Sequence, residues 1–226
     1  ILSPGSMEAS FRASGAAVDA VDKIMTGKAL NAFCAVRPPG HHAEFSQAMG
    51  FCLFNSAAIA AVYARTAHRV ERVAVVDFDV HHGNGTQHSI EQDPGLMYAS
   101  SHQWPAYPGT GLASETGVDG NVVNAPLAPG AGSLEFREAY EDLILPTLRS
   151  FNPELLIISA GFDAHARDPL AQLNLQSEDY AWVTEQLLDV ASKFCGGRVV
   201  GLLEGGYDLD ALRQSVQAHL RVMIAA

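Results

Sequence analysis

The segment 77–86, which reads DFDVHHGNGT, places two carboxylates and two histidines directly after the apolar run VERVAVV. Buried charge is costly unless something compensates it, and a metal ion would do so. In an extended chain alternate residues point the same way, so Asp77, Asp79 and His81 share one side of the chain. A D-x-D-x-H run of this kind can therefore aim three donors at one region.

Oxygen and imidazole ligands together suit zinc, and a catalytic zinc ion typically has three protein ligands and one open position. The third ligand has to come from another strand end. The segment FDAHARDPL offers Asp163, His165 and Asp168 for this role. Spacing alone does not choose among these three residues.

Other apolar runs also end in residues that could do chemistry. The run NAFCAV is followed by RPPGHH, which contains His41 and His42, and the run RVVGLLEGG is followed by YDLD, which begins with Tyr207. Ligands of parallel α/β sheets bind just beyond the carboxyl ends of the strands. The joint pattern at four strand ends predicts a metal-dependent hydrolase.

The rest of the chain supplies the elements that would position these residues. Helical spacing and short apolar runs alternate, which predicts an α/β fold with a parallel sheet covered by helices on both faces. We expect helices over 6–25, 55–67, 134–151 and 177–194, and strands over 31–36, 72–80, 154–161 and 198–207. Pro146 should kink or end the third of these helices.

Composition narrows the class of protein. The 226 residues carry a net charge of −11, which argues against direct nucleic-acid binding and is compatible with a cationic substrate. No apolar run reaches the ~18–20 residues that cross a bilayer, and no signal peptide is expected at the start. Three scattered cysteines predict no disulfide framework and favour a reducing, cytoplasmic location.

The motifs RPPGHH, GFCLFN, DFDVHHGNGT, YPGTG, SAGFDAHARDPL and LEGGYDL together resemble the histone deacetylase family, especially its class II-like and bacterial members. Acetylpolyamine amidohydrolases belong to the same superfamily. The resemblance implies an arginase/deacetylase-like fold, with zinc held by Asp79, His81 and Asp168.

The same resemblance implies roles for the neighbouring residues. His41 and His42 match the paired active-site histidines, Asp77 matches the acid that orients His41, and Tyr207 matches the catalytic tyrosine that donates to the developing oxyanion. Asn84 stands where many members have an acid that partners the second histidine, so the general-base role is open between His41 and His42.

Further positions of the family match binding residues. Phe51 and Tyr107 correspond to the aromatic walls of the acyl-lysine tunnel, and Gly50, directly before Phe51, is expected to contact the substrate as well. A structural potassium ion is implied beside the zinc, held largely through backbone carbonyls. The residues of that site would be Asp77, Asp79, His81, Ser100 and Ser101.

The expected protein is a single catalytic domain over 1–226, incomplete at both ends relative to the family. We expect a zinc-dependent amide hydrolase that acts on acylated lysine in a peptide or protein. The alternatives are an acetylpolyamine amidohydrolase and a truncated relative that binds zinc or acyl-lysine without turnover. A manganese ureohydrolase like arginase is disfavoured, because that class usually has D-x-H-x-D where this chain has D-x-D-x-H. No membrane partner is expected, and the oligomeric state is open.

Overall fold

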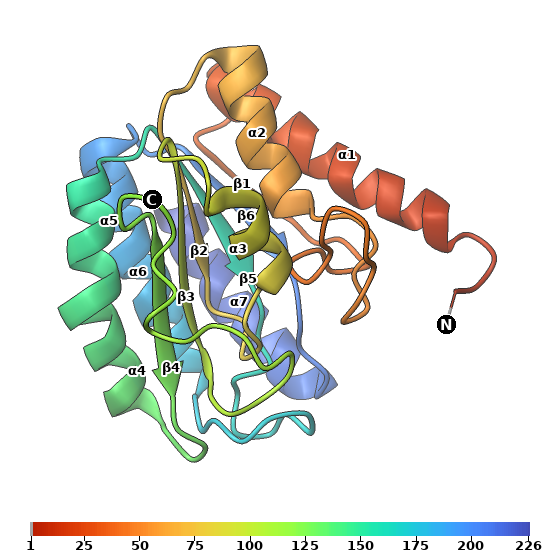
Figure 1. Cartoon of the computed structure of the whole chain (residues 1–226), viewed down its shortest axis with the longest axis vertical. Helices are drawn as coiled ribbons and strands as arrows, with labels where there is room; N and C mark the ends of the chain where they lie inside the picture. The colour runs from red at the N-terminus through yellow and green to blue at the C-terminus, as the bar shows by residue number, and fades with distance from the viewer. Residues whose placement is uncertain (1) are drawn as a thin grey trace.

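The computed structural model describes residues 2–226 and confirms the expected α/β class. Its centre is a six-stranded sheet in which every neighbouring pair is parallel, in the order β1-β6-β5-β2-β3-β4 (Figure 1). The strands are β1 (Asn31–Cys34), β2 (Val73–Asp77), β3 (Leu96–Gln103), β4 (Val122–Leu127), β5 (Leu155–Ala160) and β6 (Val199–Leu203).

Helices cover both faces of the sheet, as Figure 1 shows. Helices α1 and α2 pack on one face, and the helical elements α4, η1, α5 and α6 pack on the other. The helical elements are α1 (Ser6–Met25), α2 (Ser56–His68), α3 (Asn84–Ile90), α4 (Ser133–Ala139), η1 (Tyr140–Ile144), α5 (Leu145–Phe151), α6 (Ser177–Phe194) and α7 (Leu209–Ala225). In the described residues, no helix is both long and apolar enough to span a bilayer.

Alternation along the central strands explains why their sequences are apolar throughout. On β2, Val73 and Val75 enter the core shared with α1 and α2, while Ala74 and Val76 enter the core on the opposite face. Strand β5 divides its side chains between the two cores in the same way. A strand buried on both faces reads as a continuous apolar run, as the sequence indicated.

The structure differs in detail from several of the expected elements. The helical segment does not end at Pro146, because it continues through a π-helical turn, η1, into α5, which has the proline in its first turn. The wider turn lies where the proline ring would otherwise meet the carbonyl of the preceding α-turn. The strand expected over 72–80 ends at Asp77, so Asp79 and His81 lie in the loop that follows. The strand expected over 198–207 ends at Leu203, so Tyr207 also lies in a loop.

The register brings the carboxyl ends of the central strands together. Asp77, the last residue of β2, pairs with Ser159 of β5 on one side and with Ser100 of β3 on the other. The loops after β2 and β5 therefore leave the sheet side by side, and the loop after β6 leaves next to that of β5. This edge of the sheet holds the candidate site.

Candidate active site

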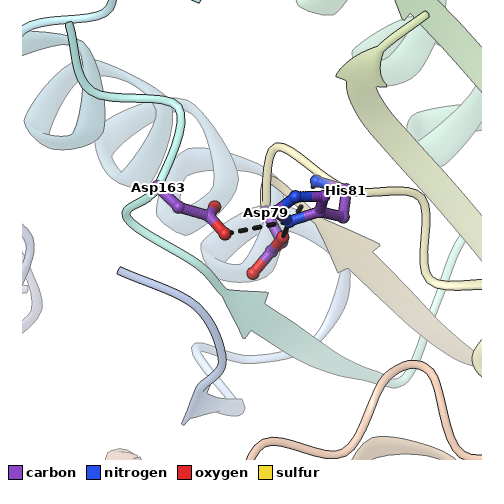
Figure 2. Close-up of side chains that lie close together, drawn as sticks. All are labelled: Asp79, His81 and Asp163. Carbon is purple, nitrogen blue, oxygen red and sulfur yellow. Dashed lines mark hydrogen bonds and ion pairs between the residues drawn. The ribbon is translucent and has the colours of Figure 1, made fainter. Parts of the chain in front are cut away.

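Asp79, His81 and Asp163 form a compact group at the centre of this edge. Each offers one atom that could bind a metal ion, and these atoms lie within 4.8 Å of one another. The Nδ1 atom of His81 is 3.1 Å from Oδ2 of Asp163 and 3.2 Å from Oδ1 of Asp79. Figure 2 shows the three side chains pointing toward one another from the loops after β2 and β5.

The backbone around the group fixes the two carboxylates. The Gly205 N–H donates to Oδ2 of Asp79 over 2.8 Å, and the Val80 N–H donates to Oδ1 of Asp163 over 2.9 Å. Glycine is needed at 161 and 205, because a Cβ at either position would overlap a carboxylate of the group. Glycine at these positions therefore lets the backbone approach the carboxylates of Asp79 and Asp163 closely.

Asp168, which the resemblance assigned as the third ligand, is not part of this group. Its Oδ2 accepts the Tyr207 N–H over 2.8 Å, and its Oδ1 accepts the Leu170 N–H over 3.0 Å. His165, the other open alternative, accepts the Arg167 N–H at Nδ1 over 3.1 Å. Of the three residues that the sequence offered, the structure brings Asp163 to Asp79 and His81.

The buried acids of the group are stabilised by a positive charge nearby. Asp79 and Asp163 are both buried. Burial and the negative charge of Asp79 raise the pKa of Asp163 to about 7. Burial disfavours the charged form of His81, yet hydrogen bonds to Asp163 and Asp79 raise its pKa to about 10. A proton on His81 therefore compensates part of the negative charge of the two buried acids, and a bound cation would supply this positive charge instead.

The two paired histidines lie against this group, with ring centroids 4.0 Å apart. His41 Nδ1 is 3.0 Å from Oδ2 of Asp77, and His42 Nδ1 is 2.9 Å from Oδ1 of Asn84, so each ring has the neighbour that the sequence suggested. The Nε2 atom of His41 is 3.8 Å from Oδ1 of Asp79.

The two histidines differ in charge. Burial disfavours the charged form of His41, but the carboxylates of Asp79 and Asp77 outweigh it and raise its pKa. Burial and the adjacent His41 lower the pKa of His42 to about 3. At neutral pH this arrangement gives one charged and one neutral imidazole beside the same group.

Glu204 is a buried acid beneath the histidines that sequence reasoning missed. Its Oε2 accepts the Gly40 N–H over 2.7 Å and the His41 N–H over 3.2 Å, and its Oε1 accepts the Ser159 hydroxyl over 3.1 Å. Burial raises the pKa of Glu204 to about 7. An acid that interrupts the apolar run RVVGLLEGGY was the available signal, since such a residue needs internal partners.

Aromatic residues flank the group on two sides. The ring centroid of Phe51 is 6.2 Å from that of Tyr207, and the centroid of Tyr107 is 5.1 Å from that of His42. The side chains of Phe51 and Tyr107 remain 71% and 47% exposed. Gly50 has a φ of 54°, and a Cβ there would overlap the His42 ring, so glycine allows this wall to approach the histidine.

Tyr207 lies close enough to the group for its charges to act on the phenol. Burial raises the pKa of Tyr207, and the carboxylates of Asp79 and Asp163 raise it further. The phenol is therefore protonated at neutral pH and remains a hydrogen-bond donor.

The serines expected near a potassium ion are both buried on β3. Ser100 is the register partner of Asp77, and its hydroxyl is 2.9 Å from Nδ1 of His102. The hydroxyl of Ser101 donates to that of Tyr140 over 3.3 Å.

Comparison with known proteins identifies the group of proteins to which this arrangement belongs. The family described as "Histone deacetylase domain" matches residues 1–223. The chain is similar to histone deacetylase 14, chloroplastic, of Arabidopsis thaliana, with 40% identity over 95% of this chain and 53% of the relative. It is also similar to the histone deacetylase-like amidohydrolase of Pseudomonas aeruginosa, with 42% identity over 91% of this chain and 55% of the relative.

Among solved structures, the chain superposes on the crystal structure of the HDA15 HD domain with a TM-score of 0.91 and 41% identity. The match covers 96% of this chain and 62% of that one. The chain thus spans about half to two thirds of the length of these three proteins.

Proposed function

Because the chain belongs to the histone deacetylase family, we propose that it is a zinc-dependent amide hydrolase that removes acetyl or related acyl groups from lysine side chains. The observation that carries this proposal is the buried group of Asp79, His81 and Asp163 beside two histidines and a tyrosine. In the proposed ligand set Asp163 replaces Asp168.

The donor set fits zinc. Two carboxylates and one imidazole make three protein ligands, the number typical of a catalytic zinc site with an open position. The glycines at 161 and 205 let the backbone pack against the two carboxylates and hold them in place. When bound, zinc would polarise an acyl carbonyl and lower the pKa of a water molecule.

The residues of the chain would supply the remaining chemistry. His42, beside the neutral amide of Asn84, can accept a proton as general base, while Asp77 would stabilise a charged His41 that can donate one to the leaving amine. The Tyr207 hydroxyl would donate to the developing oxyanion, a contribution of about 3–4 kcal/mol to the barrier in comparable sites. The manganese ureohydrolase alternative is not favoured by any observation.

Phe51 and Tyr107 are proposed to hold the apolar stem of the substrate, since a long amine chain packs its methylenes on aromatic faces. The side chains of both residues are largely open to solvent, with Phe51 71% and Tyr107 47% exposed. Walls this exposed favour an acyl-lysine within a peptide over a free acetylpolyamine, whose selection requires a narrow entrance. Potassium coordinated by backbone carbonyls near Asp77, Asp79, His81, Ser100 and Ser101 is part of the proposal on the resemblance alone.

The location and the partners are proposed from the cysteines and the net charge of the chain. Cys34, Cys52 and Cys195 are all buried and unpaired, which supports a reducing compartment such as the cytoplasm. The net charge of −11 supports a cationic substrate and no direct nucleic-acid partner.

The test compares kcat/KM of the zinc-loaded chain for an acetyl-lysine peptide and for acetylspermidine at one ionic strength. We expect turnover of both, with preference for the peptide, and loss of turnover in Asp163→Ala. The variant Asp189→Ala, which removes an exposed carboxylate on α6, is the matched control. Preference for acetylspermidine above about tenfold, or 1.4 kcal/mol, would make the polyamine the substrate. Absence of turnover with either substrate would leave a zinc- or acyl-lysine-binding relative.

A further inference from the structure

Asp168 is a buried acid that the proposed metal site does not use. Its side chain is 8% exposed, and both of its oxygens accept backbone N–H groups, one from Tyr207 and one from Leu170. A carboxylate can accept several hydrogen bonds at once, so it can link two loop segments through their backbone N–H groups. The segment it holds at Tyr207 carries the proposed oxyanion donor.

The loop from β6 to α7 is anchored on both sides of Tyr207. Before it, the Gly205 N–H donates to Asp79, and the Gly205 carbonyl accepts the Phe162 N–H over 2.9 Å. After it, Asp208 caps α7 by accepting the Ala211 N–H over 2.8 Å. These anchors fix the ends of the loop but leave the peptide between residues 206 and 207 free to turn.

Gly206 makes that turn easy. Its φ of 135° lies in a region that side chains rarely adopt, so the backbone here has the freedom that only glycine provides. Two contacts hold the Gly206–Tyr207 peptide in one orientation. The Tyr207 N–H donates to Asp168, and the Gly206 carbonyl accepts from Nη2 of Arg37 over 3.2 Å. The Arg37 side chain is exposed, so the buried Asp168 is the stronger of the two restraints.

We propose that Asp168 is a positioning residue that fixes the Tyr207 peptide and so the placement of the Tyr207 phenol. The proposal rests on the proposed function, because it assigns Asp168 a part in the step that Tyr207 assists. It differs from a ligand role, since Asp168 acts through the backbone of Tyr207.

The test is a double-mutant cycle on the zinc-loaded chain with an acetyl-lysine peptide. Asp168→Ala should lower kcat about 10- to 100-fold with KM nearly unchanged, a loss bounded by that of removing an oxyanion donor. In the Tyr207→Phe background, where no hydroxyl remains to be positioned, Asp168→Ala should change kcat less than about twofold. Asp168→Asn, which keeps one acceptor oxygen, should recover part of the loss.

Three further measurements complete the test. The zinc content of Asp168→Ala should equal that of the parent chain, and hydrogen exchange of the backbone over 205–208 should become faster. Asp210→Ala, an exposed acid three positions after Tyr207, is the control and should leave kcat within about twofold. Thermal unfolding of each variant verifies that it is folded.

An equal loss of kcat in both backgrounds, or loss of zinc in Asp168→Ala, would overturn the proposal. A parent chain without turnover would instead refute the proposed function. The exchange measurement would still test the role of Asp168 in that case. Unchanged hydrogen exchange over 205–208 in Asp168→Ala would show that Asp168 does not hold the loop.

Discussion

Replacement of Glu204 by alanine should strongly destabilise the chain, and replacement by glutamine should not. Glu204 accepts hydrogen bonds from two buried backbone N–H groups, those of Gly40 and His41, and from the Ser159 hydroxyl. In Glu204→Ala both N–H groups lose their acceptor. An unsatisfied buried donor costs about 1–3 kcal/mol, so we expect a loss of about 3 kcal/mol in the free energy of unfolding.

Glu204→Gln preserves this pattern. Its amide oxygen can accept from the two N–H groups, and its amide nitrogen can donate to the Ser159 hydroxyl oxygen. The expected cost is therefore about 1 kcal/mol or less at a pH where Glu204 is protonated. Because Gln keeps the size and the acceptor of Glu204, the Gln variant is a control for the loss of the negative charge alone, and the Ala variant adds the loss of the hydrogen bonds and of side-chain volume.

The two variants should also differ from the parent in their pH dependence. Burial raises the pKa of Glu204 from 4.5 to about 7, so the folded chain holds a proton that the unfolded chain releases. The associated stability is fully present below pH 4.5 and is lost as the pH rises to about 7. Relative to Glu204→Gln, the metal-free parent should lose up to about 3 kcal/mol over this range.

Urea unfolding followed by circular dichroism, on metal-free protein at several pH values, measures both effects. Equal stability of Glu204→Ala and Glu204→Gln would refute the stabilising role of the hydrogen bonds from the Gly40 and His41 N–H groups to this acid. A parent chain whose stability relative to Glu204→Gln does not change between pH 4.5 and pH 7 would refute the raised pKa.

Three further changes should have separable effects. Tyr207→Phe should lower turnover about 10²- to 10³-fold with normal zinc content, and unchanged turnover would exclude the oxyanion role. Gly161→Ala should reduce zinc content, measured by elemental analysis, because the new Cβ would overlap the Asp79 carboxylate. Burial lowers the pKa of His219 from 6.5 to about 4, so between these pH values the imidazole is protonated in the unfolded chain but not in the folded one. The free energy of unfolding therefore falls as the pH drops below 6.5. His219→Leu should remove about 2 kcal/mol of the stability difference between pH 7 and pH 5 in urea unfolding, and an unchanged pH dependence would contradict this.

The central elements were predictable from the sequence because burial on both faces makes a strand apolar throughout. Strands β2, β5 and β6 all follow from such runs. Strands β3 and β4 were not recognised, since their sequences LMYASSHQ and VVNAPL contain polar residues or proline. The polar half of β3 is buried because Ser100 and His102 bond to each other beneath the site. Helices α3 and α7 were also missed.

The sequence predicted the position of the candidate site at the carboxyl ends of the strands and its composition of acids and histidines, but it did not predict every residue. The carboxyl ends of parallel strands meet at one edge, so the gathering of His41, His42, Asp79 and His81 followed from the order of the motifs. Which acid of FDAHARDPL joins them depends on how the chain turns after β5. That turn directs Asp163 to Asp79 and His81 and leaves Asp168 against the Tyr207 backbone, which spacing does not reveal.

A zinc titration of the metal-stripped chain, followed by turnover of an acetyl-lysine peptide, tests the central claim most directly. We predict that turnover rises in proportion to added zinc and reaches its maximum at about one equivalent per chain, as a three-ligand catalytic site requires. Turnover that does not depend on zinc, or that requires two equivalents of manganese, would contradict the account.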